Sequence, residues 1–258
     1  MAARSAILPL PRSVRQWLGV ARSVRIYYGS RERLRRMTAL YRRFVKPGHL
    51  VFDIGSHVGD RIVAFHRLGC RVVAVEPQPA AFRFLRTLYG RRKSVTLVQA
   101  AMSDRPGTLS LRLNLANPTI STASNAFIDA AQGASGWEGQ QWEDVVEVPA
   151  MTLDGLIAAH GVPAFAKIDV EGFELEVLNG LTQPLPALSF EFTTIQRDVA
   201  EACVARLMTL GAYRFNLALG ESQQLSFAAS ISADELLAHL RTLPHDANSG
   251  DVYALLRG

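Results

Sequence analysis

The stretch 51-VFDIGSHVGD-60 decides the fold, because an apolar run ends in an acid and is followed at once by two glycines four residues apart. The run from His49 to Gly55 predicts a buried strand, and Asp60 to Leu68 has the pattern of a helix. Gly55 allows a tight turn, and Gly59 allows the helix to approach the sheet closely. Such turns often hold a phosphate at the helix N-terminus. An aspartate at position 53 would repel that phosphate, so another kind of ligand is indicated.

The same alternation of short apolar runs and helical stretches continues along the chain. Continuously apolar strands in this order predict a parallel sheet with right-handed crossovers and helices on both faces. About seven sheet strands are expected, which is typical of a doubly wound α/β fold. The predicted sheet strands are 49–55, 71–77, 94–100, 164–170, 187–192, 212–219 and 251–257, with helices at 60–68, 79–89, 153–160, 173–178, 198–210 and 232–243.

The order loosens after a further strand predicted at 107–113. Residues of about 114–144 are rich in Ser, Gly, Asn and Ala. A long insertion within a compact domain is usually functional or mobile. We interpret this segment as a lid-like loop on the acceptor side of the site.

The N-terminal segment 1–46 is a basic leader that precedes a domain at 47–258. It holds twelve Arg and Lys and the single acid Glu32, a net charge of +11, so the rest carries −6 of the total of +5. A helix is predicted with an apolar face repeating at helical spacing. Packing of this helix on its own domain is favoured over a contact with anionic lipid or a partner, and over an unpacked tail. The residues of that face are Val14, Trp17, Leu18, Ala21, Val24 and Tyr28.

The composition favours a cytoplasmic protein. Cys70 and Cys203 lie too far apart for a ligand pair and are expected to be reduced thiols. The early run "AILPL" is too short for a signal-peptide core, and no run reaches membrane-spanning length. A sequence pI of about 9.5 invites a nucleic-acid partner, but the charge lies in the leader rather than on the domain. We therefore predict no nucleic-acid partner.

Glu76 sharpens the identity of the ligand. It ends the second strand about twenty residues after the glycine turn, where a carboxylate can accept both hydroxyls of an adenosine ribose. A nicotinamide dinucleotide would place its pyrophosphate near Asp53, whereas S-adenosylmethionine carries an ammonium and a sulfonium. His57 and Val58 also stand where a dinucleotide site would need a further glycine. The pattern favours S-adenosylmethionine, although a turn cap at Asp53 and a solvated strand end at Glu76 are the structural alternatives.

Acceptor chemistry is expected at the end of the strand 164-AFAKIDV-170. In an extended chain Lys167, Asp169 and Glu171 lie on one side, and three ionisable groups on an apolar strand need partners or a purpose. We predict that Asp169 borders the sulfonium, that Glu171 deprotonates the acceptor hydroxyl and that Lys167 keeps the carboxylates charged. A purely structural pair of Lys167 and Asp169 is the alternative. Glu191 and His57 are further candidates for the base.

Other chemistries have little support. A divalent ion could be gathered by Asp169, Glu171 and Glu191, but nothing in their spacing demands one, so no metal is predicted. The Asn/Asp-Pro-Pro-aromatic motif of many amino-group methyltransferases is absent, since "DVEG" stands in its place. There is no HEXXH motif, P-loop or nucleophile elbow.

The motifs "VFDIGSHVGD", "VVAVEPQP", "VTLVQAAMSD", "TLDGLI" and "AKIDVEGFELEVLNGL", in this order, resemble the FkbM family of S-adenosylmethionine-dependent methyltransferases. The resemblance runs from about Arg33 to Leu256. It implies a Rossmann-like class I fold with a mostly parallel seven-stranded sheet and an antiparallel C-terminal strand. It also implies O-methylation of a sugar, glycan or secondary metabolite. His57 departs from the asparagine that is usual in the family.

The residues expected to bind the cofactor lie at four strand ends. The adenine is expected near Gln99 to Asp104, where the backbone of Ala101 and the side chain of Ser103 can bond its edge. For the function as a whole, the alternatives to a methyltransferase are a nicotinamide oxidoreductase and a non-catalytic protein that binds an adenosine ligand. The full set is Asp53, Gly55, Ser56, His57, Gly59, Glu76, Gln78, Ala101, Ser103 and Asp169.

Overall fold

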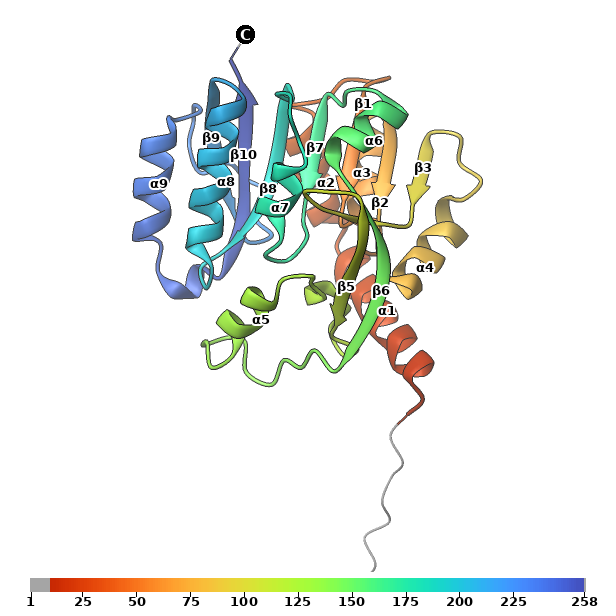
Figure 1. The fold of residues 1–258 in the computed structure, drawn as a ribbon. Helices are drawn as coiled ribbons and strands as arrows, with labels where there is room; N and C mark the ends of the chain where they lie inside the picture. The colour runs from red at the N-terminus through yellow and green to blue at the C-terminus, as the bar shows by residue number, and fades with distance from the viewer. Residues whose placement is uncertain (1–9, 258) are drawn as a thin grey trace, which may run out of the picture.

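The computed structural model describes residues 10–257, so most of the "AILPL" run and the first nine residues of the leader lie outside it. A seven-stranded sheet forms the centre, in the order β3-β2-β1-β7-β8-β10-β9 (Figure 1). Only β10 is antiparallel to its neighbours. The predicted fold class is thereby confirmed. The strands are β1 (Leu50–Ile54), β2 (Arg71–Val75), β3 (Val95–Val98), β7 (Phe165–Ile168), β8 (Ala187–Thr193), β9 (Tyr213–Leu219) and β10 (Ser249–Leu256).

Helices cover both faces of this sheet (Figure 1). Alternation along β1 sends Val51 to one face and Phe52 and Ile54 to the other, and all three are buried. The face of Val51 packs against α2 (Arg31–Tyr41), α3 (Asp60–Arg67) and α4 (Pro79–Tyr89). The other face packs against α6 (Leu153–His160), α7 (Glu174–Asn179), α8 (Arg197–Leu210) and α9 (Ala233–Thr242). A short 3-10 helix η2 (His245–Ala247) precedes β10.

A second, three-stranded sheet lies beyond the carboxyl ends of the central strands (Figure 1). Its order is β4-β6-β5, from β4 (Ala101–Met102), β5 (Gly107–Leu113) and β6 (Asp144–Met151). The sequence predicted β5 but missed β6, because β6 alternates exposed and partly buried residues and buries only Val148 and Ala150. The segment interpreted as a lid contains η1 (Pro118–Ile120) and α5 (Asn125–Ala131), and Ser124 caps the start of α5. This segment is thus folded against the site rather than an irregular loop.

The first helix, α1 (Arg12–Tyr28), packs on η1 and α4. It buries Gly19, Val20 and Ser23, and a Cβ at Gly19 would lie 2.5 Å from Cγ of Pro118. The helix is as predicted, but its buried face is not, since Val14, Trp17 and Leu18 are exposed. The helix can approach η1 this closely only because position 19 is glycine. The prediction looked for large apolar residues at helical spacing and therefore missed this face. None of the helices within residues 10–257 is long and apolar enough to span a membrane.

Helix α2 is tied to the domain by Arg33, whose residue exposure is 8%. Its Nη1 donates to Oδ2 of Asp60 at 2.8 Å and to the carbonyl of Tyr27, and its Nε and Nη2 donate to Oε2 of Glu221. The two carboxylates raise the pKa of Arg33 against the lowering effect of its burial. The guanidinium therefore joins α1, α2, α3 and the segment after β9.

We predict that Arg33→Ala lowers the free energy of unfolding by about 3 kcal/mol, because it leaves Asp60 buried without this partner. Urea denaturation measures the change. Arg35→Ala is the control, since Arg35 is exposed on the same helix, and we expect a loss below about 0.5 kcal/mol. Equal losses in the two variants would show that the ion pair contributes nothing.

Candidate functional site

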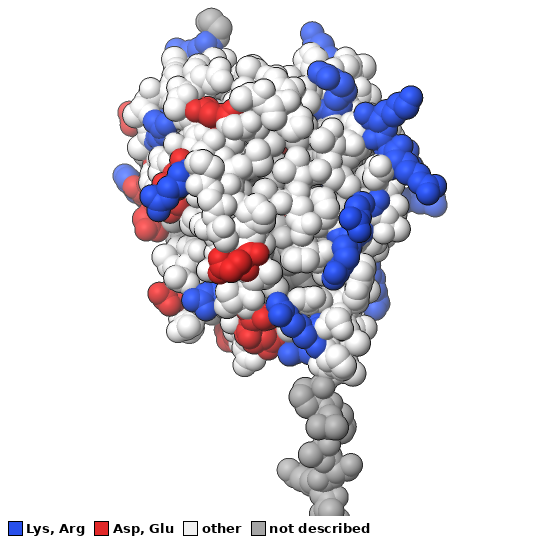
Figure 2. Space-filling model, turned by 45° about the vertical axis from the view of Figure 1, so that its right-hand side comes forward, with Lys and Arg blue, Asp and Glu red and all other residues white. Residues whose placement is uncertain are grey.

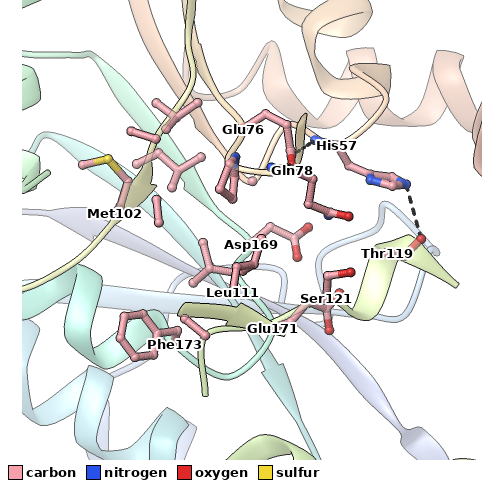
Figure 3. Close-up of a pocket in the computed structure, with 18 residues that line it drawn as sticks. His57, Glu76, Gln78, Met102, Leu111, Thr119, Ser121, Asp169, Glu171 and Phe173 are labelled. Atoms are coloured by element: carbon pink, nitrogen blue, oxygen red, sulfur yellow. Dashed lines mark hydrogen bonds between the residues drawn. The ribbon is translucent and has the colours of Figure 1, made fainter. Parts of the chain in front are cut away.

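A pocket lies at the carboxyl ends of β1, β2 and β7 and is closed by β4, β5 and η1 (Figure 3). Its volume is about 530 Å³, including space open to solvent. Three of its lining residues are acids: Glu76, Asp169 and Glu171. No lysine or arginine of residues 10–257 is among its lining residues. The chemistry of the pocket wall therefore favours a ligand with positive charge and hydroxyl donors over one with phosphates.

The loop between β1 and α3 forms one wall and rests on the end of β7. Gly55 has φ +79°, and a Cβ there would lie 1.7 Å from the carbonyl oxygen of Asp169. Gly59 has φ +83°, and a Cβ there would lie 2.8 Å from Leu85 of α4. Both glycines are thus required by conformation and by space. The sequence prediction assigned the tight turn to Gly55, which its positive φ fits, and the approach of the following helix to the sheet to Gly59. The space beside Gly59 is instead taken by Leu85 and Tyr89 of α4.

Glu76 holds the same loop from β2. It is 2% exposed, its Oε2 accepts the backbone N–H of His57 at 2.7 Å, and its Oε1 accepts that of Gln78 at 2.8 Å. Burial raises the pKa of Glu76 to about 7, although the two N–H groups oppose that shift. Each oxygen keeps a further lone pair that can accept a hydroxyl from the pocket.

Asp53 lies beneath the loop and is not among the pocket's lining residues. It is 1% exposed, and neither carboxylate oxygen has a hydrogen-bond partner within residues 10–257. It stands opposite Lys167 in the register of β1 and β7, and Ser56 Oγ donates to its backbone carbonyl. Burial raises the pKa of Asp53 to about 7. A buried carboxylate without donors is costly to charge, and a cation nearby would relieve that cost.

His57 presents an uncharged imidazole to the pocket. Burial lowers its pKa to about 4. Its Nε2 lies 3.5 Å from Oγ1 of Thr119 (Figure 3). Its Nδ1 has no partner among residues 10–257, and the ring of Tyr27 from α1 meets the imidazole edge to face. Its φ of +47° is uncommon for a residue other than glycine, and asparagine, aspartate and histidine are the residues most often found there after glycine. This strained position fits a family pattern in which asparagine usually stands there.

The acids that follow β7 and β8 form a cluster. Oxygens of Asp169, Glu171 and Glu191 lie within 4.8 Å of one another. Lys167 Nζ lies 3.1 Å from Asp169 Oδ2 and 2.7 Å from Asp251 Oδ1, and it is fully buried. The sequence predicted that Lys167, Asp169 and Glu171 lie on one side of an extended strand. The three residues do lie near one another, but the strand does not continue to Glu171, because β7 ends at Ile168 and Glu171 has φ +57°.

The three acids differ in their proton affinity. Burial tends to raise the pKa of Asp169, but Lys167 and Arg61 hold it at about 2. Burial, followed by the charges of Asp169 and Glu174, raises the pKa of Glu171 well above its usual range. Burial, Glu171 and Asp169 likewise raise that of Glu191. Asp169 is therefore a fixed anion, whereas Glu171 and Glu191 can exchange a proton.

The structure gathers most of the predicted site residues around one pocket. Ser56, Gly59 and Lys167 support its wall without lining it, as does Asp53. Ser103 is 3% exposed and its Oγ donates to Asp104, so it also stays outside. The predicted residues that line the pocket are Gly55, His57, Glu76, Gln78, Ala101, Asp169 and Glu171.

The sequence prediction missed two supporting residues. Arg61 Nη2 lies 3.5 Å from Asp169 Oδ2, and a cation in the first turn of α3 opposes the helix dipole, which was an available signal. Thr122 is fully buried and its Oγ1 donates to the carbonyl of Glu171 at 2.6 Å. A threonine within a polar segment gives no signal of that role.

The strand order, with one antiparallel strand beside the edge, and the pocket at the carboxyl ends define a Rossmann-like class I methyltransferase fold. Residues 53–217 match the Methyltransferase FkbM domain. The chain belongs to this family, which confirms the resemblance predicted from the motifs.

Two named methyltransferases are similar to this chain in sequence. The chain is 29% identical over 164 residues to the hexuronic acid methyltransferase AglP of Haloferax volcanii, covering 62% of this chain and 61% of AglP. It is 31% identical over 163 residues to the 31-O-demethyl-FK506 methyltransferase FkbM of Streptomyces tacrolimicus, covering 53% and 61%. The matches thus span about three fifths of each relative's length. A solved TehB-like SAM-dependent methyltransferase of Corynebacterium glutamicum aligns over 96% of this chain and 100% of that chain with a TM-score of 0.48 and 9% identity, which is too distant to support an inference.

We predict that Gly55→Ala lowers the free energy of unfolding by about 3 kcal/mol or more, because a methyl group would overlap the carbonyl of Asp169. Gly133→Ala is the matched control, since Gly133 has φ +78° with nothing within 4 Å of its Cβ position. The control isolates the cost of the left-handed backbone, about 1 kcal/mol. Urea denaturation compares the two, and equal losses would contradict the close approach of the loop to β7.

Proposed function

We propose that this protein is an S-adenosylmethionine-dependent O-methyltransferase that acts on a hydroxyl of a sugar, a glycan or a secondary metabolite. Family membership and the names of the two relatives support this proposal. The names of these relatives give a hexuronic acid and 31-O-demethyl-FK506 as their acceptors, and we propose an acceptor hydroxyl of a comparable kind for this protein. The buried free thiols of Cys70 and Cys203 fit a cytoplasmic location for it.

The observation that carries the proposal is the acidic pocket wall without a lysine or arginine among its lining residues. A dinucleotide would bring a doubly negative pyrophosphate close to Asp53 and Asp169, and the wall offers it no neutralising side chain. S-adenosylmethionine brings an ammonium, a sulfonium and two ribose hydroxyls, which match carboxylates. The carboxylate oxygens of Asp53 have no hydrogen-bond partner within residues 10–257, and the positive charge of this ligand would stabilise the ionised carboxylate.

Each part of the ligand has a candidate partner in the chain. Glu76 accepts the ribose hydroxyls with its remaining lone pairs, and Gln78 lies beside it. The backbone at Ala101, with Met102, borders the adenine. Asp169 and, from beneath the loop, Asp53 supply the negative charge for the aminoacyl end. S-adenosylmethionine itself supplies an activated methyl group for an in-line displacement.

The acceptor side is formed by Glu171 with η1 and the residues after it. Glu171 takes the proton of the acceptor hydroxyl on a carboxylate oxygen, since an alcohol is a poor nucleophile until it is deprotonated. Its raised pKa makes it a stronger base than an ordinary glutamate. Thr122 fixes the backbone of Glu171, and the apolar wall of Leu111 and Phe173 limits water in the pocket. Lys167 and Arg61 keep Asp169 ionised while this proton moves.

We predict that the protein binds S-adenosylhomocysteine in calorimetric titration and does not bind NAD. Glu76→Ala should weaken this binding about tenfold to a hundredfold, because it removes a charged hydrogen-bond partner worth about 1.5–3 kcal/mol. Asp53→Ala should also weaken it, because the carboxylate beneath the loop acts on the cationic ligand through its charge. Glu76→Gln separates charge from shape, since it keeps the size of the side chain. Asp129→Ala, an exposed acid on α5, is the control and should bind as the parent does. NAD binding with no binding of S-adenosylhomocysteine would overturn the proposed function in favour of an oxidoreductase.

A second prediction concerns the base. With an acceptor identified from a panel of uronic acids, glycans and macrolide alcohols, Glu171→Gln should lower kcat about a hundredfold to ten-thousandfold. Affinity for S-adenosylhomocysteine should change little, because Glu171 faces the acceptor. A larger loss in Glu191→Gln than in Glu171→Gln would transfer the role of base to Glu191.

The pH dependence follows from the groups that face Glu171. Burial, Asp169 and Glu174 raise its pKa, whereas Lys167 and Arg61 lower it. Glu191 belongs to the same cluster of acids, and its own pKa is raised by burial and by Glu171. A base must be deprotonated, so kcat/KM should rise with pH through a pKa well above 4.5. The bound sulfonium should move the corresponding limb of kcat to lower pH. A flat acidic limb in the parent enzyme would contradict the assignment of a carboxylate base.

A further inference from the structure

The exposed apolar side chains of this protein are concentrated on two helices. Of the ten large ones in residues 10–257, six lie within residues 10–28 and a seventh is Leu88 of α4. Four of them form what we call the apolar stripe, and they are 41–56% exposed: Val14, Trp17 and Leu18 of α1, and Leu10 just before that helix. Scattered apolar residues are ordinary, whereas a contiguous stripe marks a contact surface.

The stripe faces away from the domain because α1 is already anchored by its opposite side. Val20 packs with Val58 and Ala80, and Gly19 lies against η1. Arg12 and Arg15 form ion pairs with Asp144 and Glu143 of the segment that begins β6. The helix is therefore held in place with the stripe outward. Its exposure is a property of the folded domain rather than of an unpacked tail.

Positive charge surrounds the stripe. Helix α1 has four arginines and no acid, and the sequence from Pro77 to Ser103, which includes α4, has five basic residues and no acid. The two helices are in contact, and the guanidinium of Arg83 lies 5.9 Å from the centre of the Trp17 ring. Figure 2 shows Lys and Arg side chains gathered along one side of the molecule. Besides Arg12 and Arg15, whose charges are paired with Asp144 and Glu143, the basic residues are Arg22, Arg25, Arg83, Arg86, Arg91, Arg92 and Lys93.

We propose that the surface of α1 and α4 binds the headgroup region of an anionic lipid bilayer. A helix with tryptophan and leucine on one side and arginines beside them lies in the plane of such an interface. The apolar stripe can be buried in the acyl region of a bilayer, whereas a nucleic acid offers it no apolar phase. The arginines can pair with anionic headgroups, which a neutral bilayer lacks. Both conditions are met together by acidic phospholipid.

This contact would place the pocket close to the bilayer surface. Tyr27 of α1 meets the ring of His57, and Gln78, at the start of α4, donates to the carbonyl of Pro118 in η1. The helices of the proposed lipid surface therefore also border the pocket. An acceptor carried by a lipid, or dissolved in the interface, would meet the site without leaving the membrane.

Sedimentation of the full-length protein with vesicles tests the proposal. We expect binding to vesicles of equal parts phosphatidylglycerol and phosphatidylcholine, no binding to phosphatidylcholine alone, and weakening by salt. Replacing three stripe residues should reduce binding more than about tenfold through lost apolar burial. The combined variant is Val14→Gln, Trp17→Gln and Leu18→Gln.

A second variant removes charge and keeps the stripe. Loss of three exposed arginines should weaken binding about a hundredfold, since each contributes about fivefold near an anionic surface. The charge variant is Arg25→Gln, Arg86→Gln and Arg91→Gln. A matched control changes two exposed apolar residues and one arginine elsewhere and should bind within about twofold of the parent. The control is Val162→Gln, Met208→Gln and Arg105→Gln.

Three results would overturn the proposal. The first is equal binding to neutral and anionic vesicles, and the second is equal binding by the stripe variant and the control. The third is a dimer in sedimentation velocity that the stripe variant dissociates, because the stripe would then be covered by a second copy. Melting temperature and affinity for S-adenosylhomocysteine are measured for every variant. Unchanged values show that a loss of vesicle binding is not a loss of folding.

Discussion

A chain of alternating charges runs beneath the pocket, and the arrangement of the site depends on it. Each link is an ion pair of 2.7–3.5 Å, and the chain crosses from helix α2 through the start of α3 to β7 and β10. Ion pairs this buried add little net stability, but removing one member leaves its neighbour charged and unsolvated. Their effect is to fix where each group stands and which group keeps its proton. The members in order are Glu221, Arg33, Asp60, Arg61, Asp169, Lys167 and Asp251.

Asp169 is the member of the charge chain that lines the pocket, and its pairing with two cations distinguishes it from the other acids there. Asp169 is paired with Arg61 and Lys167 and stays ionised, so it is a constant negative charge beside the pocket. Lys167 lowers the pKa of both Glu171 and Glu191, and Arg61 lowers that of Glu171, but burial and the neighbouring acids outweigh these cations. The proton affinity of the two glutamates is raised because the protein supplies fewer positive charges than negative ones around them. A cationic methyl donor would correct this imbalance, so the arrival of the donor and the readiness of the base are physically coupled.

Most of the fold was predictable because it depends on local patterns. The apolar strands and the intervening helices follow directly from sequence periodicity, and the glycine turn with Glu76 marks the pocket end of the sheet. The second sheet was only partly predictable, since β6 is half exposed and packs on few residues. The charge chain was not predictable, because its members are far apart in sequence and meet only after folding. The exposed face of α1 was misassigned because Gly19 and Val20, which look unremarkable in the sequence, fit the space against η1 and α4.

The two sides of helix α1 contact different surroundings: one side packs on the pocket wall, and the other carries the apolar stripe. Its buried side is part of the site, since Tyr27 packs on His57 and Gly19 positions η1, whose Thr119 lines the pocket. The side of α1 that faces the domain contacts η1 directly. The charge chain reaches the same helix at Arg33, whose Nη1 donates to the carbonyl of Tyr27, so α1, η1 and the donor end of the pocket belong to one packed unit.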